Sequence, residues 1–291
     1  MLSIDMDNKL NNLFLDNDDN FLTNLRKDPN KYITALKESD KNDVYELILY
    51  LQILQTFPYE VSFLINNPYW SDAKKVLDLG CGPGFQTSKL ANFFLEKTFK
   101  GIDINNDFIK RASSTRETNN CKFVCDDVYN LNNLKFDYII TRNFLQHIKD
   151  LKSCFNNIKK MLNENGRLVV FEGEYSLDMY EPKIPYLEEI QNELLSKQKQ
   201  KGTDKEIGMN LETCANDFGF RTEKVQRVII PILTDETKLL FLKIKFVRFQ
   251  VLYNLYGFEI DYPKLAHSLL DWMESNNSYA QEGLINLSII N

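Results

Sequence analysis

The sequence predicts an α/β fold built on a doubly wound, seven-stranded, mostly parallel β-sheet with helical additions. Two observations predict it. Strand-like apolar runs alternate with amphipathic helical segments between residues 74 and 173, and one of these runs, ending at Leu79, leads into a glycine-rich turn and a helix-like segment. Such alternation implies a parallel sheet with right-handed crossovers, and the strand–turn–helix unit is typical of nucleotide-binding folds.

The first 70 residues are expected to form a helical cap ahead of the sheet domain, which spans 71–291. Residues 1–40 carry apolar residues at helical spacing among many Asn, Asp and Lys, which predicts short helices. Residues 41–67 predict a longer helix, broken near Pro58 because proline removes a helical hydrogen bond.

The elements of the sheet domain follow in chain order. Strands are predicted at 74–79, 98–104, 121–125, 135–141 and 167–173, with helices at 85–97, 106–118 and 150–163 between them. Further on, helices at 182–201 and 208–218 precede a strand at 221–230, a helical insertion at about 235–275 and a final strand at 283–290. The final strand can pair at the sheet edge. One domain with helical attachments explains this order better than two independent domains.

The run from residue 76 to residue 84, Val-Leu-Asp-Leu-Gly-Cys-Gly-Pro-Gly, is the most informative motif. Glycines in a turn let a ligand approach the backbone where a side chain would block it. The spacing departs from the dinucleotide fingerprint Gly-x-Gly-x-x-Gly, because the third glycine comes one residue early. Asp78 stands two residues before the first glycine, where a carboxylate suits a cationic ligand better than a diphosphate.

This run resembles motif I of the class I S-adenosylmethionine-dependent methyltransferases, whose ligand carries a sulfonium and an ammonium. The resemblance implies the Rossmann-like fold of that class and S-adenosylmethionine as the cofactor. The turn residues that it implies at the cofactor are Asp78, Gly80, Cys81 and Gly82. It covers residues 70–175 well and 205–230 in part, but neither the first 60 residues nor the 235–275 insertion. In the family such uncovered segments form the substrate lid.

The second predicted strand ends in Gly101-Ile102-Asp103-Ile104. An acid about 20 residues after the glycines can accept hydrogen bonds from both hydroxyls of a ribose. Asp103 is therefore the expected ribose ligand, and Ile104 would lie against the adenine. The alternative is a surface aspartate that merely follows a strand.

The third predicted strand leads into Asp126-Asp127-Val128. This stretch resembles the family's adenine-reading segment, where an acid accepts from the exocyclic amine and the following backbone N–H meets a ring nitrogen. Aligning Leu131 with the family's leucine places Asp127 at the acid position and Val128 after it. Asp126 is the alternative.

The fourth predicted strand leads into Arg142-Asn143-Phe144-Leu145-Gln146-His147. The region resembles methyltransferases of small molecules, including those of ubiquinone and menaquinone biosynthesis, which often carry paired histidines here. Gln146 replaces the first histidine, His147 keeps the second, and Arg142 is expected at the cofactor. A histidine with an unperturbed pKa of about 6.5 can take a proton near neutral pH, so His147 is the candidate general base. The alternative is a histidine that packs against the sheet and holds a loop.

Two acids follow the fifth predicted strand, near the expected substrate mouth. Glu172 and Glu174 could bind a cationic group or orient a base, and Glu172 is the second catalytic candidate. The alternative is a pair of surface carboxylates at a strand end. The aromatic residues expected to wall the acceptor site are Tyr59, Trp70, Phe144 and Tyr175.

Composition narrows the class of protein. A net charge of −6 over 291 residues disfavours a nucleic-acid partner. Five cysteines without a Cys-x-x-Cys pair, and only two histidines, predict a reducing compartment and no metal site. The acidic N-terminus is unlike a signal peptide, and no apolar run reaches the roughly 20 residues that span a bilayer. We therefore expect a cytoplasmic location without membrane insertion.

The expected function is methyl transfer from S-adenosylmethionine to an oxygen, nitrogen or carbon atom of a small organic molecule. No Asn/Asp-Pro-Pro-Tyr/Phe motif follows the fourth predicted strand, which disfavours methylation of nucleic-acid bases or protein glutamine. One alternative is a protein or peptide methyltransferase, which would want an open acidic groove. The other is a non-catalytic binding module, whose mark would be decay of the glycines or the ribose acid.

Overall fold

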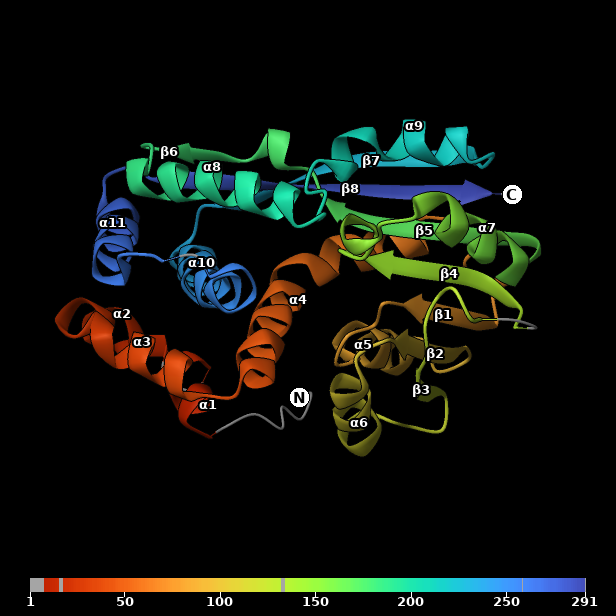
Figure 1. The fold of residues 1–291 in the computed structure, drawn as a ribbon, viewed down its shortest axis with the longest axis horizontal. Coiled ribbons are helices and arrows are strands. Elements are labelled where there is room, and N and C mark those ends of the chain that lie inside the picture. Colours follow the sequence, from red (N-terminus) through yellow and green to blue (C-terminus); the bar gives the residue numbers. More distant parts are fainter. Residues whose placement is uncertain (1–7, 16–17, 132–133, 258, 291) are drawn as a thin grey trace.

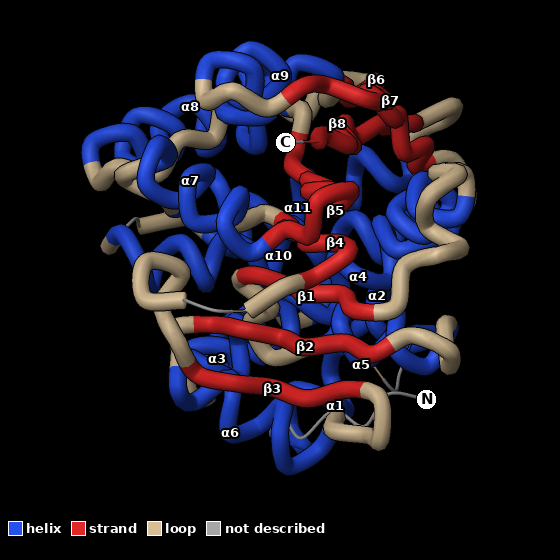
Figure 2. The backbone as a smooth tube through the Cα atoms, turned by 90° about the vertical axis from the view of Figure 1, so that its right-hand side faces the viewer, coloured by secondary structure: helices blue, strands red, loops and turns tan. Residues whose placement is uncertain are grey.

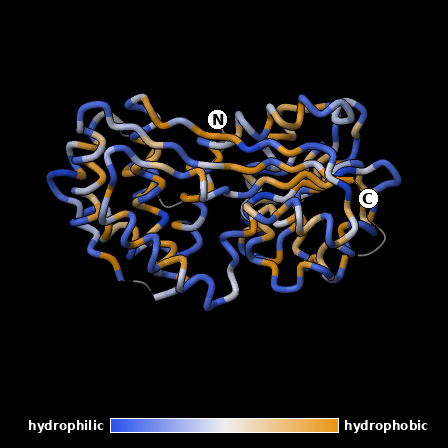
Figure 3. The backbone as a smooth tube through the Cα atoms, turned by 90° about the horizontal axis from the view of Figure 1, so that it is seen from above, coloured by the Kyte–Doolittle hydropathy of each residue, from blue (hydrophilic) through white to orange (hydrophobic). Residues whose placement is uncertain are grey.

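The protein has a twisted β-sheet flanked by helices and, beside it, a body made of helices (Figure 1). The computed structural model describes residues 8–15, 18–131, 134–257 and 259–290. Figure 3 shows these two parts side by side, with hydrophobic segments running through the interior of each.

The sheet has eight strands, and its order fixes where a ligand can bind. They are β1 (Lys75–Leu79), β2 (Thr98–Asp103), β3 (Cys121–Cys125), β4 (Phe136–Arg142), β5 (Leu162–Gly173), β6 (Met179–Glu181), β7 (Arg221–Ile232) and β8 (Tyr279–Ile290). The first five are parallel in the order β3-β2-β1-β4-β5, as Figure 2 shows, and β8 follows antiparallel to β5. Strand order reverses between β1 and β4, and open α/β sheets bind ligands at that switch point, beyond the carboxyl ends of the strands.

The predicted doubly wound, mostly parallel sheet is thus confirmed, with two differences at its antiparallel end. The last strand was expected at the sheet edge, but β8 lies between β5 on one side and β7 on the other. Its burial explains this position, because Ile285, Leu287 and Ile289 are fully buried and an edge strand would expose its backbone. The three-residue β6, which pairs with the start of β8, has no counterpart in the sequence prediction.

Helices cover both faces of the sheet. Those packed directly on it are α5 (Phe85–Phe93), α6 (Asn106–Thr115), α7 (Leu151–Met161) and α9 (Ile207–Asp217). In α7, Cys154, Phe155, Ile158 and Met161 recur at helical spacing, so one stripe of the helix is buried against the sheet. Helices α7 and α9 share one core cluster with the sheet, and α5 and α6 share another on its other face.

The remaining helices form one cap body. They are α1 (Asn8–Phe14), α2 (Asp18–Lys27), α3 (Pro29–Glu38), the first half of α4 (Lys41–Ile65), α8 (Pro185–Gln200), α10 (Asp235–Tyr256) and α11 (Tyr262–Glu274). Residues from both ends of the chain, such as Phe14, Leu47, Phe246 and Leu269, share one hydrophobic core there. The N-terminal helices and the insertion therefore pack as a unit.

Helix α4 links the cap to the sheet. Its first half lies in the cap core and its second half lies in the sheet core, with Phe63 packed edge-on against Phe171. The expected break near Pro58 is wrong, because the helix runs unbroken from Lys41 to Ile65. By length and composition α4 could cross a membrane, unlike the sequence expectation, but half of its apolar window is buried inside the fold. Buried Glu46 and Glu60 further mark it as a core helix.

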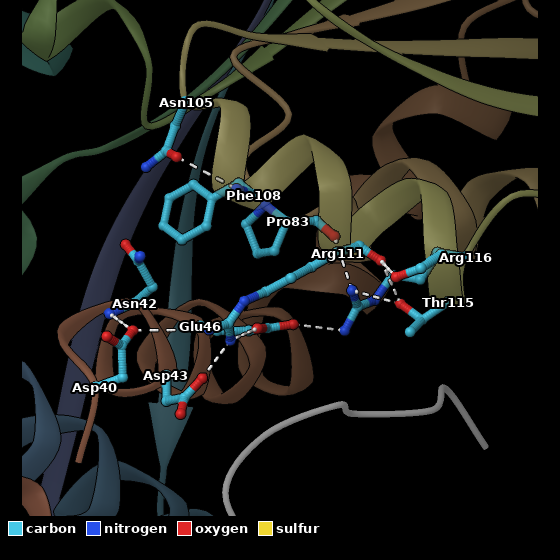
Figure 4. Close-up of polar contacts among 11 residues, drawn as sticks. Asp40, Asn42, Asp43, Glu46, Pro83, Asn105, Phe108, Arg111, Thr115 and Arg116 are labelled. Carbon is cyan, nitrogen blue, oxygen red and sulfur yellow. Dashed lines mark hydrogen bonds and ion pairs between the residues drawn. The ribbon is translucent and has the colours of Figure 1, made fainter.

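An ion-pair network fastens the first half of α4 to α6 (Figure 4). Buried Glu46 accepts from Arg116 at 2.6 Å and from Arg111 at 3.0 Å, and Arg111 also pairs with Asp43. Arg116 donates to the carbonyl oxygen of Pro83, inside the glycine-rich turn, at 3.1 Å. The network therefore ties the cap directly to that turn.

Candidate functional site

A cavity of about 860 Å³ lies between the carboxyl ends of the parallel strands and the cap helices. Its walls come from both bodies, since the sheet loops face residues of α4 and α10 across it. Eleven of the residues predicted from the sequence line it: Gly80, Gly82, Asp103, Ile104, Asp126, Asp127, Val128, Arg142, Phe144, His147 and Tyr175. Residues from five separate segments of the chain thus meet at one place.

The glycine-rich turn is held open toward this cavity. Gly80, Gly82 and Gly84 have φ angles of +77°, +53° and +82°, in the left-handed region that side chains disfavour. A Cβ at Gly80 would lie 2.2 Å from the ring of Phe144. The backbone N–H groups of Gly80 and Cys81 both donate to the carbonyl oxygen of Ile102, at 2.8 and 3.0 Å. The turn is therefore pinned to β2 and closely packed, with no room for a side chain at its first glycine.

Asp103 is fixed at the end of β2 by backbone donors. Its Oδ2 accepts from the N–H of Gly82 and its Oδ1 from the N–H of Asn105, both at 2.8 Å. Burial raises the pKa of this carboxyl, and these two bonds act against that rise. Ile104 beside it is 69% exposed although it lines the cavity, so an apolar face is available to a planar ligand.

Asp126 and Asp127 both lie on the cavity wall. Asp126 accepts from the N–H of Asp127 at 2.8 Å, and Asp127 accepts from the N–H of Tyr129 at 3.0 Å. Each of these bonds uses one carboxylate oxygen, Oδ1, so each side chain has a second oxygen for a ligand. The geometry is compatible with either residue as the adenine acid.

A small pocket of about 50 Å³ adjoins the main cavity at the turn and accounts for two more predicted residues, Asp78 and Cys81. Asp78 accepts from the hydroxyl of Thr87 at 2.5 Å, and burial raises its pKa to about 7. Arg142 borders both pockets and is held by Glu60 at 2.8 Å and Thr56 at 3.0 Å. A carboxylate and a guanidinium therefore meet at this end, as an amino-acid zwitterion would require.

His147 ends the short 3₁₀ helix η1 (Leu145–His147), on an exposed stretch of the cavity wall. Desolvation and the positive charge of Lys205 lower the pKa of its imidazole to about 4, so the ring is neutral at pH 7. Gln146 beside it donates to the carbonyl oxygen of Asn143 at 2.9 Å. Asn143 has a φ of +48°, and its position on the cavity wall was not anticipated.

Glu172 and Glu174 do not line the cavity. Glu172 is buried behind η1, where its Oε1 accepts from the N–H of Leu145 at 2.8 Å, and burial raises its pKa to about 7. Glu174 is buried too, and its Oε1 accepts from the hydroxyl of Ser176 at 2.7 Å. The expectation that either acid faces the substrate mouth is therefore corrected, because both side chains are buried, Glu172 within β5 and Glu174 at the start of η2 (Tyr175–Leu177).

Two expected aromatic walls also lie elsewhere. Tyr59 packs against a small cluster on β7 and β8, formed by Val228, Ile230 and Leu284. Trp70 is buried edge-on against Tyr138 in the sheet core. Neither residue lines the cavity, because the second half of α4 and the turn after it pack on the sheet and not over the site.

Other aromatic and charged residues line the cavity instead of Tyr59 and Trp70. Tyr45 of α4 stacks on Phe108 of α6 with ring centroids 5.5 Å apart, and both line the cavity beside Ile104. At another part of the wall lie Lys205 and Arg248. One feature of the sequence could have indicated Arg248. It is a charged residue within the apolar stretch of α10, in the insertion that no motif covers.

Taken together, the site fits a nucleoside joined to an amino acid. The residues predicted for the ribose, the adenine and the glycine-rich turn line one cavity, and Asp78 and Arg142 meet in the small pocket that adjoins it. No cluster of His, Cys, Asp and Glu side chains suited to a metal occurs among the described residues.

Comparison with known proteins places this site in a family. A sequence family described as a methyltransferase domain matches residues 71–226, more than half of the chain. A malonyl-[acyl-carrier protein] O-methyltransferase of Bacillus anthracis is 31% identical over 96 residues, covering 33% of this chain and 36% of that protein. A second such enzyme, from Ilyobacter polytropus, is 25% identical over 159 residues, covering 49% and 61%. The chain thus matches less than two thirds of the length of either relative.

A solved structure agrees on the fold. A protein of Bacillus halodurans assigned as a methyltransferase superposes with a TM-score of 0.50 at 15% identity, over 79% of this chain and 98% of that one. The family match, the fold and the cofactor-shaped site coincide. This chain belongs to the methyltransferase-domain family, with the Rossmann-like fold of the class I methyltransferases and S-adenosylmethionine as its cofactor.

Proposed function

We propose that this protein is an enzyme that transfers the methyl group of S-adenosylmethionine to an oxygen, nitrogen or carbon atom of a small organic acceptor. One observation carries the proposal: the cavity joins the glycine-rich turn and Asp103 to a wall built from the cap helices. A site enclosed between two bodies can align a small acceptor with the cofactor and keep water away, which is what methyl transfer needs.

The cofactor residues are proposed as follows. Asp103 holds the ribose hydroxyls, Ile104 and Val128 flank the adenine, and Asp127 accepts from its amine, with Asp126 as the alternative. Gly80, Cys81 and Gly82 bring backbone close to the amino-acid part, where Asp78 and Arg142 face the ammonium and the carboxylate. Bound S-adenosylmethionine supplies an electrophilic methyl group on its sulfonium.

The acceptor side is proposed to lie near η1 and the end of β5. Phe144 and Tyr175 line it, and His147 is the candidate base that takes a proton from the acceptor. Glu172 acts here as a positioning residue, because it holds the N–H of Leu145 and so the loop that carries His147. The chain itself contributes alignment, exclusion of water and one proton acceptor.

Two other functions remain as alternatives with distinct signatures. A protein or peptide methyltransferase would want an open acidic groove, whereas this cavity is roofed by the cap; an acyl group on a carrier protein, as in the relatives' names, could still enter. A non-catalytic binding module is disfavoured by the intact glycines and Asp103.

We also propose a cytoplasmic location. The five cysteines are all free, which agrees with a reducing compartment.

Cofactor affinity tests the proposal directly. Calorimetry with S-adenosylhomocysteine should give a micromolar dissociation constant, near −8 kcal/mol. Asp103→Ala should weaken that affinity at least about tenfold, since the ribose hydroxyls and the N–H of Gly82 lose one acceptor together. Asp107→Ala changes an exposed acid in the first turn of α6; it is the matched control and should bind normally.

Two outcomes would contradict this assignment. Unchanged binding by a folded Asp103→Ala protein would remove Asp103 from the ribose site. Tight binding of NAD without binding of S-adenosylhomocysteine would show that the cavity serves another class of cofactor.

A further inference from the structure

Lys205 and Arg248 place two positive charges on the cavity wall. Lys205 precedes α9 and Arg248 belongs to α10, so the two bodies of the protein each supply one cation to the same wall. Both side chains are half-buried. Neither forms an ion pair within 4 Å with any carboxylate in the described part of the chain.

Both cations reach the phenol oxygen of Tyr175. Lys205 Nζ donates to it at 3.3 Å and an Arg248 Nη at 3.5 Å, both long for hydrogen bonds to a charged donor. Burial raises the pKa of this phenol, but the two cations outweigh that effect and lower it below its usual value. The surroundings of Tyr175 thus favour negative charge.

The carboxylates near Lys205, Arg248 and Tyr175 accept hydrogen bonds from other partners. Glu282 pairs with Lys245 at 2.5 Å and accepts from Gln55 at 2.8 Å. Asp178 accepts from the N–H of Gly283 at 2.9 Å. Glu172 accepts from the N–H of Leu145 behind η1. The negative charges of these groups partly offset the two positive charges. None of these carboxylates accepts a hydrogen bond from Lys205 or Arg248, so both cations keep donors for a ligand.

Lys205, Arg248 and Tyr175 lie on the other side of the cavity from the acids proposed to bind the cofactor. The acids of the site, Asp103, Asp126 and Asp127, follow β2 and β3, on one side of the switch point. Tyr175 follows β5, on the other side, and Lys205 is close enough to His147 to lower its pKa. The cations therefore sit on the side where the acceptor is proposed to bind.

We propose that Lys205, Arg248 and the Tyr175 hydroxyl form a subsite for a carboxylate of the methyl acceptor. This deepens the proposed function and rests on it, by naming the acceptor as an anionic small molecule. A guanidinium, an ammonium and a phenol hydroxyl, close together on one wall, supply N–H and O–H donors for the two oxygens of a carboxylate. Burial in a cavity makes such charge-assisted bonds stronger than they would be at the surface.

Simple probes test the subsite without knowledge of the natural acceptor. Calorimetry on the full-length protein saturated with S-adenosylhomocysteine would compare phenylacetate, neutral phenylacetamide and phenyl phosphate. Phenylacetate should bind at least about tenfold more tightly than the amide. Lys205→Met and Arg248→Met should each remove most of that preference and leave amide binding unchanged. Tyr175→Phe should reduce the preference less, and Arg248→Lys should keep part of it.

The controls separate this inference from the proposed function. Lys152→Met removes the same charge from an exposed site on α7 and should keep the full preference. Affinity for S-adenosylhomocysteine, measured on every variant, reports folding and the cofactor site alone. Normal cofactor binding with equal affinity for phenylacetate and its amide would overturn the subsite while the methyltransferase proposal stands. A stronger preference for phenyl phosphate would overturn the carboxylate assignment, and equal loss in Lys152→Met would show only general attraction.

Discussion

His147→Ala is expected to lower turnover by about 10²–10⁴-fold while affinity for S-adenosylhomocysteine stays within a few-fold. The side chain lies on the cavity wall, on the side proposed for the acceptor, and its pKa of about 4 leaves the ring neutral at pH 7. Gln146 beside it cannot take a proton, and Glu172 is buried behind the loop. No cavity-facing neighbour on η1 can therefore replace it.

The control for this variant is the second histidine of the chain. His267 is exposed on α11, away from the cavity, so His267→Ala should leave turnover unchanged. A His147→Ala protein that loses thermal stability while turnover per folded molecule falls only a few-fold would give His147 a structural role instead. In that case an acceptor that ionises in water by itself would explain methyl transfer.

The pH dependence of the rate follows from the lowered pKa of His147. The folded-state pKa of His147 lies below its usual value, so the neutral form predominates above about pH 4. The rate should then show no ascending limb from this group between pH 5 and pH 8, and any such limb should appear near pH 4. For the same reason the contribution of His147 to stability is present above about pH 6.5 and is lost as the pH falls toward 4.

That the residues proposed for the cofactor lie together could be predicted because their determinants are local. The glycines, Asp78 and Asp103 stand at fixed distances from strand ends, and the strand pattern alone puts those ends at one edge of the sheet. Periodicity likewise predicted the helices of the insertion, although not that they share a core with the N-terminal helices.

The acceptor half could not be predicted because it depends on how distant segments pack. Tyr59 was expected in the cavity, but α4 turns that face toward β7 and β8. Lys205 and Arg248 lie in segments without a motif, and only the docking of α10 against the sheet loops brings them together at Tyr175. Glu172 was expected just after its strand, but it lies within β5, and whether an acid near a strand end faces the cavity or the core depends on the loop that covers it.

The second large effect concerns stability. Glu46→Gln is expected to lower the free energy of unfolding by about 3–5 kcal/mol, because it removes the charge of the buried carboxylate that Arg116 and Arg111 share. Affinity for S-adenosylhomocysteine should fall as well, since this network holds α4, with Tyr45, at the cavity wall, and Arg116 also donates to the carbonyl oxygen of Pro83 in the turn. Denaturant unfolding and calorimetry on the same preparations would measure both effects.

The matched control is an ion pair of similar length at the surface. Glu38 pairs with Lys9 at 2.8 Å with both side chains about half-exposed or more, so Glu38→Gln should cost less than about 1 kcal/mol. If the loss in Glu46→Gln comes from an uncompensated charge, adding Arg116→Met should restore part of the stability, a clear departure from additivity. A Glu46→Gln protein as stable as Glu38→Gln would show that packing alone, and not this network, fastens the cap to the sheet.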